Sequence, residues 1–359
     1  MKTLLISSLL LVAAYGGSDH QENFKEIIDI VNSSGAKWKA GQNFGENTTV
    51  ASLKKFLGLK RDRLFKLPLR AEHPTLNSKI PESFDARDNW PACDSIRHIR
   101  DQGTCGSCWS IHVLKSAVLI YFNRLVSLKE SAGVAVAAAG AFTDRLCIAT
   151  NGKFTLPLSS EELLACCSSC GDGCNGGYPS AAWKYFASNG LVTGGDYKSD
   201  VGCQPYEIPA CSHHVKGSLP SCDSLPESKT PKCQRKCTNS AYPGSFSSDH
   251  HKLKSYYSVS DRVEEIQKEI MLHGPVEAGY TVYSDFPTYK SGVYHYVTGE
   301  ELGGHAVKII GWGVEDGTPY WLIANQWNES WGDKGLFKIL RGKDECGIES
   351  EIVAGIPKV

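Results

Sequence analysis

The chain has 359 residues, enough for one large domain or for two lobes that each bury an apolar core. Its formal net charge is −1 and its sequence pI is about 6.8. Binding to nucleic acid or to an anionic membrane surface usually requires an excess of positive charge. The composition therefore argues against nucleic-acid and membrane partners.

The N-terminal segment 1–17 predicts a secretory signal peptide. Lys2 precedes an apolar run over 4–14, and small residues stand at Ala14 and Gly16. The run is too short to cross a bilayer, and the sequence has no later apolar stretch long enough to do so. We therefore expect a protein of the secretory pathway, lysosomal or extracellular, with no membrane span. A buried N-terminal helix is the alternative.

Residues 18–79 contain no cysteine and differ from the rest of the chain. Apolar residues between Phe24 and Val31 predict a short amphipathic helix, and residues 38–44 predict a loop anchored by aromatic side chains. Residues 60–79 are basic and contain prolines, which predicts an exposed segment open to proteolysis. A small accessory domain is the alternative to a removable segment.

Residues 80–359 predict the main domain. Helices are expected over 160–165 and 180–188, among loops rich in glycine and cysteine. From residue 255 onward alternating patterns predict strands over 276–282, 292–297, 305–312, 320–325 and 336–340. The order of these patterns predicts an α+β protein in which a helical lobe faces a β-barrel lobe.

The chain contains 14 cysteines, which in a secreted protein predict disulfides. Structural zinc is the alternative, because Cys-x2-Cys or Cys-x3-Cys spacings occur at 167/170, 170/174 and 233/237. The sequence by itself leaves the pairing open.

Residues 102–109 read Gln-Gly-Thr-Cys-Gly-Ser-Cys-Trp and make Cys108 the candidate nucleophile. A cysteine attacks a carbonyl only as thiolate, and a helix N-terminus stabilises that negative charge. A helix is predicted after Trp109, so Cys108 is expected at its start.

Three further residues complete a candidate catalytic set. His305 is expected to take the thiol proton, and the Asn325 amide is expected to orient the imidazole ring. The Gln102 side chain is expected to stabilise the oxyanion together with the Cys108 backbone N–H. Read one at a time, Cys108 is better explained as a structural cysteine and His305 as a core histidine; the catalytic hypothesis depends on the whole set.

These motifs resemble those of papain-family cysteine peptidases, and within that family the cathepsin B-like branch. The resemblance extends from about Ile80 to Pro357, and more weakly before it. It implies a papain-like two-lobe fold with the active-site cleft between the lobes, no cofactor and no metal. It also implies that 18–79 is an inhibitory propeptide, that 80–359 is the peptidase domain, and that peptides, proteins and cystatin-like inhibitors are partners.

The resemblance also implies a disulfide pattern that leaves Cys108 and Cys346 unpaired. The implied pairs are Cys93–Cys147, Cys105–Cys174, Cys166–Cys233, Cys167–Cys170, Cys203–Cys237 and Cys211–Cys222.

Substrate-binding residues follow from the same resemblance. Gly176 and Gly177 offer backbone to an extended peptide, and Gly304 clears the opposite wall. Trp327 is expected to shield the His305–Asn325 hydrogen bond. Glu351 is expected at the base of the pocket for the second residue before the scissile bond.

Residues 203–237 resemble the occluding loop of that branch, which implies peptidyl-dipeptidase as well as endopeptidase activity. His213 and His214 match the histidine pair that binds a substrate's C-terminal carboxylate. Two ion pairs close the loop in relatives of this branch. One is expected here between His213 and Asp101, whereas Leu219 and Ser330 occupy the positions of the other.

Residues 110–134 depart from the family pattern. The resemblance predicts 14 positions between the nucleophile and the cysteine matching Cys147, but here the separation is 39. The segment is a gene-model artefact, a real surface excursion, or the mark of a disabled enzyme. A catalytically impaired papain-fold binding protein is therefore the alternative function. An adhesive disulfide-rich protein and acyl transfer to an amine are further alternatives.

Overall fold

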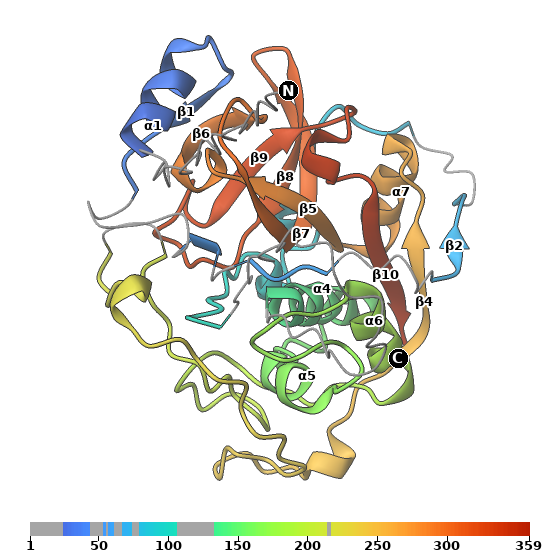
Figure 1. Cartoon of the computed structure of the whole chain (residues 1–359). Helices are drawn as coiled ribbons and strands as arrows, with labels where there is room; N and C mark the ends of the chain where they lie inside the picture. The colour runs from blue at the N-terminus through green and yellow to red at the C-terminus, as the bar shows by residue number, and fades with distance from the viewer. Residues whose placement is uncertain are drawn as a thin grey trace, which may run out of the picture.

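The computed structural model describes residues 24–43, 53–54, 57–60, 67–73, 79–105, 133–213 and 217–359. A twisted sheet occupies one side of the molecule and a group of helices the other, as Figure 1 shows. Two apolar cores correspond to this division, one within the sheet and one around the helices. The predicted α+β arrangement of two lobes is confirmed.

The sheet follows the order β1-β6-β9-β8-β7-β5-β10-β4-β2, and β3 pairs separately with β7. Most of its strands either alternate buried and more exposed residues or are buried on both faces, as expected for strands that line a core. The strands are β1 (Trp38–Ala40), β2 (Leu69–Arg70), β3 (Phe84–Asp85), β4 (Leu253–Val259), β5 (Val276–Tyr283), β6 (Tyr289–Tyr294), β7 (Glu301–Glu315), β8 (Thr318–Ala324), β9 (Leu336–Leu340) and β10 (Glu351–Pro357).

The central helix of the other lobe is α4 (Gly133–Ala149), which contacts β7, α5 and α6. Its small residues Ala138, Ala139 and Ala141 are fully buried, so neighbouring elements approach it closely from several sides. A buried ion pair joins Asp144 of α4 to Lys308 of β7 at 2.6 Å. This contact fixes the helix against the strand that carries His305.

Shorter helices surround α4. The Ser159 hydroxyl accepts a hydrogen bond from the Glu162 backbone at 3.0 Å and thereby caps α5. The helices are α3 (Ala86–Asn89), α5 (Ser160–Cys166), α6 (Pro179–Ser188) and α7 (Val263–His273), with 3-10 turns η1 (Asp94–Ile96), η2 (Cys222–Ser224), η3 (Phe246–Ser248), η4 (Phe286–Thr288) and η5 (Glu345–Gly347). Helix α7 was not predicted, because the strand patterns around it dominated the interpretation.

The N-terminal region forms α1 (Phe24–Ser33), where an amphipathic helix was predicted. The prediction of a loop after it is wrong for 38–40, which form β1 and pair with β6. The Trp38 indole N–H donates to the His295 carbonyl at 2.9 Å, and the ring is buried. Burial against β6 therefore turns the expected aromatic anchor into a strand. The predicted signal peptide, 1–17, lies outside the described residues.

The structure contains the six disulfides that the family resemblance implies. Cys346 is the free cysteine among the described residues, and Cys108 lies outside them. Three of the six bridges hold the 203–237 loop, so this long segment is fixed at several points. In the part of the chain that the structure describes, no helix is both long and apolar enough to cross a bilayer.

Candidate active site

His305 and Asn325 meet where β7 and the end of β8 run side by side. The register pairs Lys308 with Ala324, which brings the next residue, Asn325, near His305. His305 Nε2 lies 2.9 Å from Asn325 Oδ1, and both side chains are buried. The Trp327 ring stacks on the imidazole with centroids 5.0 Å apart and is itself fully buried. The hydrogen bond is therefore shielded from water, which strengthens it.

The hydrogen bond decides which ring nitrogen acts as a base. Asn325 Oδ1 also accepts the Gln326 backbone N–H at 2.9 Å, so it is an acceptor and His305 Nε2 must carry the hydrogen. Nδ1 is then the basic nitrogen of the neutral ring, and it is buried with no hydrogen-bond partner among the described residues. Its lone pair is free to accept a proton from a thiol.

Burial lowers the pKa of His305 to about 4, while the Asn325 hydrogen bond opposes the shift and nearby His213 adds to it. The ring is therefore neutral at neutral and mildly acidic pH. Protonation becomes favourable when a thiolate forms beside it, because an adjacent negative charge stabilises the imidazolium.

Gln102 is hydrogen-bonded to residues near the His305–Asn325 pair. Its backbone N–H donates to the Gln326 carbonyl at 3.1 Å, and its carbonyl accepts the Tyr206 hydroxyl at 3.1 Å. The side-chain amide is buried and donates to the Cys105 carbonyl at 3.3 Å. Gln102 is thus held next to Cys105, shortly before Cys108 in the chain.

Helix α4 begins at Gly133 and contains Cys147 near its end. The separation between these two residues is the one that the resemblance predicts between the nucleophile and Cys147. Gly133 therefore stands at the helix position where the resemblance predicts the nucleophile. Residues 106–132, including Cys108 and the helix predicted after Trp109, lie outside the described residues. Gly133 and Val134, counted in the predicted 110–134 insertion, belong to α4.

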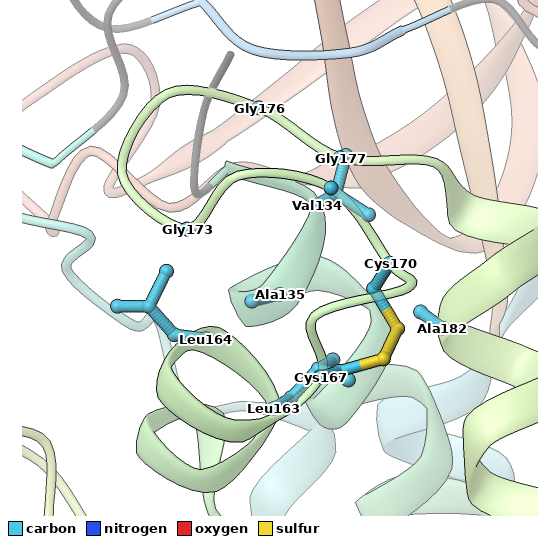
Figure 2. Close-up of a pocket in the computed structure, with 11 residues that line it drawn as sticks. Val134, Ala135, Leu163, Leu164, Cys167, Cys170, Gly173, Gly176, Gly177 and Ala182 are labelled. Carbon is cyan, nitrogen blue, oxygen red and sulfur yellow. A yellow bond between two sulfur atoms is a disulfide. The ribbon is translucent and has the colours of Figure 1, made fainter. Parts of the chain in front are cut away.

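The start of α4 lies beside the glycine-rich wall of the cleft. Val134 and Ala135 line one pocket together with Gly176 and Gly177. Figure 2 shows Val134 next to Gly177, with Ala135 below the loop that carries Gly176. The N-terminal turn of the helix therefore opens toward the predicted substrate-binding backbone.

Residues 57–60 run between that wall and the opposite one. Gly177 N–H donates to the Gly58 carbonyl at 3.2 Å, and Lys60 N–H donates to the Gly177 carbonyl at 3.0 Å. On the other side, the N–H groups of Gly58 and Leu59 donate to the Gly304 carbonyl at 2.9 and 3.0 Å. This segment of the N-terminal region therefore lies between Gly177 and Gly304, two of the residues predicted to bind substrate.

Gly304 and Gly279 make room for Leu59. A Cβ on Gly304 would lie 2.8 Å from the Leu59 carbonyl oxygen, and a Cβ on Gly279 would lie 2.6 Å from Leu59 Cδ2. The same Cβ on Gly279 would lie 3.0 Å from Glu351 Oε2, so the predicted pocket carboxylate borders this space. Gly279 was not predicted as a site residue, although a glycine inside an apolar strand often marks close approach.

The predicted contact between the 203–237 loop and the cleft is present. His213 Nε2 lies 2.8 Å from Asp101 Oδ1, with the His213 side chain fully buried. Asp101 also accepts the Gly103 and Cys211 backbone N–H groups at 2.7 and 3.1 Å. Asn328, not predicted as a contact, donates to Asp101 at 3.1 Å and to the Cys211 carbonyl at 2.6 Å. Asp101 therefore holds the 203–237 loop in place through contacts with both His213 and Cys211.

Three other positions were predicted to affect how this loop closes. His214 lies outside the described residues. Leu219 and Ser330 are exposed and carry no charge, as the sequence indicates. Cys211, His213 and Cys222 lie close enough to hold a metal ion, but the two sulfurs form a disulfide and leave no thiolate ligand.

A family model described as papain family cysteine protease matches residues 80–134 and 131–356. The chain belongs to the papain family of cysteine proteases. The propeptide model of peptidase family C1 matches residues 23–63, which include the segment lying in the cleft of this papain-family chain. The peptidase match is divided at 131–134, where α4 begins.

Several proteins that this family member matches along most of its length are named cathepsin B or cathepsin B-like. Cathepsin B-like cysteine proteinase 4 of Caenorhabditis elegans is 43% identical over 372 residues, covering 100% of each chain. A cathepsin B-like cysteine proteinase of Schistosoma japonicum is 47% identical over 287 residues, covering 80% of this chain and 76% of that one. The solved structure of proCathepsin B S9 from Trypanosoma congolense matches with a TM-score of 0.74 and 34% identity, covering 93% of this chain and 98% of that one.

Proposed function

We propose that the matured protein hydrolyses peptide bonds through a thioester on Cys108. The observation that carries the proposal is the buried His305–Asn325 pair. The Nδ1 atom of His305 has no hydrogen-bond partner among the described residues. The cleft beside it is filled by residues 57–60 of the chain itself. His305 Nδ1 takes the thiol proton, and the sulfur forms a bond to the substrate carbonyl carbon. The proton then passes to the leaving amine as the C–N bond breaks, and water cleaves the thioester by the reverse proton path.

The proposed oxyanion donors are the Gln102 side-chain N–H and the Cys108 backbone N–H. The backbone hydrogen bonds of Gln102 with Gln326 and Tyr206 support this role. A donor that is already fixed in position needs little reorganisation during the reaction. Gly176, Gly177 and Gly304 are proposed to bind substrate backbone.

The propeptide is proposed to inhibit by filling the cleft. Its segment at 57–60 uses the backbone groups of Gly177 and Gly304 that substrate would use. Removal of about residues 18–79 in the secretory pathway, lysosomal or extracellular, then exposes the site. Cystatin-like proteins are proposed to compete for the same cleft.

We further propose mixed endopeptidase and peptidyl-dipeptidase activity. The His213–Asp101 contact supports a loop that closes one end of the cleft, where His213 and His214 would receive a C-terminal carboxylate. The absence of charge at Leu219 and Ser330 supports easier opening. Trp327 would line the cleft, and Glu351 would accept arginine in the pocket that Leu59 fills.

The test is activity of the matured protein on short fluorogenic peptides. Cys108→Ala should fold with its six disulfides and lose activity by at least about 10³-fold, because the nucleophile is gone. Cys346→Ala is the matched control, since it removes the other unpaired cysteine, and it should retain activity. Near-normal turnover by Cys108→Ala would refute the proposal.

One observation favours a second candidate, a papain-fold binding protein without peptidase activity. Gly133 occupies the helix position that the family pattern gives to the nucleophile, so an intact 106–132 segment must bring Cys108 to the cleft by another path. A matured protein that binds peptides but hydrolyses none would establish this alternative.

A further inference from the structure

A pocket of about 470 Å³ opens on the helical lobe, outside the cleft. One side of it is formed by Gly140 and Thr143 of α4, and the rest comes from three loops, at 94–100, 155–157 and 195–201. At about 100° per residue, Gly140 and Thr143 lie on the opposite face of α4 from Val134 and Ala135, which line the glycine-rich pocket of Figure 2. The two pockets share no lining residue, and this one is large enough for a small organic molecule.

Gly140 leaves this space open. It lies inside α4, where glycine is a poor helix former, and its backbone does not have the positive φ that favours glycine. A Cβ built on Gly140 would have a single neighbour within 4 Å, the Nε atom of Arg100 at 3.9 Å. No close contact therefore requires a glycine here. Its effect is to keep the surface of α4 bare beside Arg100.

Arg100 supplies the positive charge beside this bare surface. Its Nη1 donates to the Leu158 carbonyl at 3.2 Å and to the Ser160 hydroxyl at 2.7 Å, and its Nη2 donates to the Thr143 hydroxyl at 3.4 Å. These acceptors are uncharged, and no carboxylate of the described residues is in ion-pair contact with the guanidinium. A guanidinium has five N–H groups, so the Nε–H and one Nη2–H remain to bind a further acceptor.

The acidic groups around the pocket do not neutralise Arg100. Asp196 Oδ2 lies 2.6 Å from His98 Nε2, so this carboxylate is directed to the His98 ring. Asp94 is exposed, and water screens its charge. Burial lowers the pKa of Arg100, and the charges of Asp196 and Asp144 only partly oppose this shift. The guanidinium can therefore accept one more anion.

The rest of the lining combines two buried hydroxyls with apolar surface. The hydroxyls of Ser95 and Ser199 are buried with no hydrogen-bond partner among the described residues. Such orphaned polar groups often mark the place of a water or a ligand. Pro157 and Val201 supply apolar surface, and Val201 is 39% exposed. The pocket thus offers a cation, hydroxyl groups and apolar carbon to a single ligand.

We propose that this pocket binds a small organic carboxylate with an apolar body, with the carboxylate on Arg100 and the body against Pro157 and Val201. A carboxylate accepts two parallel N–H bonds from a guanidinium, which matches the two N–H groups that Arg100 has left. One guanidinium with acidic neighbours suits a single negative charge better than the two charges of a phosphate. The site lies outside the cleft and does not require the proposed peptidase activity.

The experiment uses the full chain with Cys108→Ala and follows the binding of hydrocinnamate by ligand-observed NMR near neutral pH, where the probe's carboxyl group is ionised. We expect saturable binding with a Kd of about 1 mM or below, a usual affinity for so small a ligand. Hydrocinnamide has the same shape without the charge, and acetate has the charge without the apolar body. Each should bind at least about tenfold more weakly. Equal binding of the acid and the amide would overturn the assignment to Arg100.

Two substitutions at one position locate the probe. Gly140→Glu fills the open space and places a carboxylate beside Arg100, so hydrocinnamate binding should fall at least about tenfold. Gly140→Ala is the matched control, because its Cβ fits at 3.9 Å from Arg100 Nε, and its Kd should stay within about twofold of the parent value. Both residues form helix better than glycine, so neither variant should lower the unfolding temperature.

Val201→Asp tests the apolar side of the pocket separately. It removes an apolar side chain and adds a like charge, which should weaken hydrocinnamate binding several-fold, while the backbone hydrogen bond from Gly195 to the residue 201 carbonyl is kept. Binding is the readout because a narrow recess lined by Arg100 and Gly140 also reaches Asn325, so activity could change for another reason. The proposal is overturned if folded Gly140→Glu or Val201→Asp binds as the parent does, or if the parent shows no saturable binding.

Discussion

The two halves of the proposed catalytic site are built differently. The His305–Asn325 half rests on adjacent strands in continuous register, covered by a stacked tryptophan. The Cys108 half depends on a helix, and the described helix begins at Gly133, well after Cys108 in the chain. Pairing in a sheet fixes the first half from many contacts, whereas the second depends on how one loop enters one helix. An insertion at that point would change the position of the proposed nucleophile, Cys108, without disturbing the proposed base, His305.

The largest expected effect comes from removing residues 110–134. The deletion restores the separation between Cys108 and Cys147 that the family pattern predicts, and the dipole of α4 would then stabilise the Cys108 thiolate. We expect kcat/KM on a short peptide to be at least about tenfold higher for the matured deletion variant than for the matured protein that keeps residues 110–134. The reason is that both the stability of the Cys108 thiolate and its alignment with His305 improve.

The deletion carrying Cys108→Ala is the matched control and should be inactive. Equal activity of the deletion variant and the full chain would show that the 106–132 segment delivers Cys108 equally well. A folded but inactive deletion variant would show that this segment is required.

A smaller, selective effect is expected from Glu351→Ala. The carboxylate borders the space filled by Leu59, so it should pair with arginine there and do little for an apolar residue. Cleavage of substrates with arginine as the second residue before the scissile bond should fall about tenfold, as expected for one lost charge pair. Substrates with phenylalanine at that position should be nearly unchanged. An equal loss on both substrates would contradict the pocket role.

The smallest effect concerns the loop contact of His213. The contact between His213 and Asp101 holds the 203–237 loop against the peptidase domain, so losing it should favour the open loop. His213→Asn should therefore lower dipeptide release relative to internal cleavage by a few-fold. An unchanged ratio of the two activities in His213→Asn would contradict this role of the contact.

The β lobe was largely predictable because its strands carry clear alternation. Residues 336–340 were predicted as a strand and form β9, and β5, β7 and β8 overlap their predicted ranges. The disulfides came from the family resemblance, since spacing alone leaves their pairing open. Gly279 was missed as a site residue because its role depends on a partner far away in sequence, namely Leu59.

The central claim, that Cys108 is a nucleophile beside His305, is tested most directly by covalent labelling. A peptide epoxide is incubated with the matured full chain, and the modified residue is located by mass spectrometry of tryptic peptides. We predict one label per chain on the Cys108 thiol, blocked by prior addition of the 18–79 propeptide, and a strongly reduced labelling rate in His305→Ala. Labelling of Cys346 instead, or none at all in a folded protein with its six disulfides, would contradict the account.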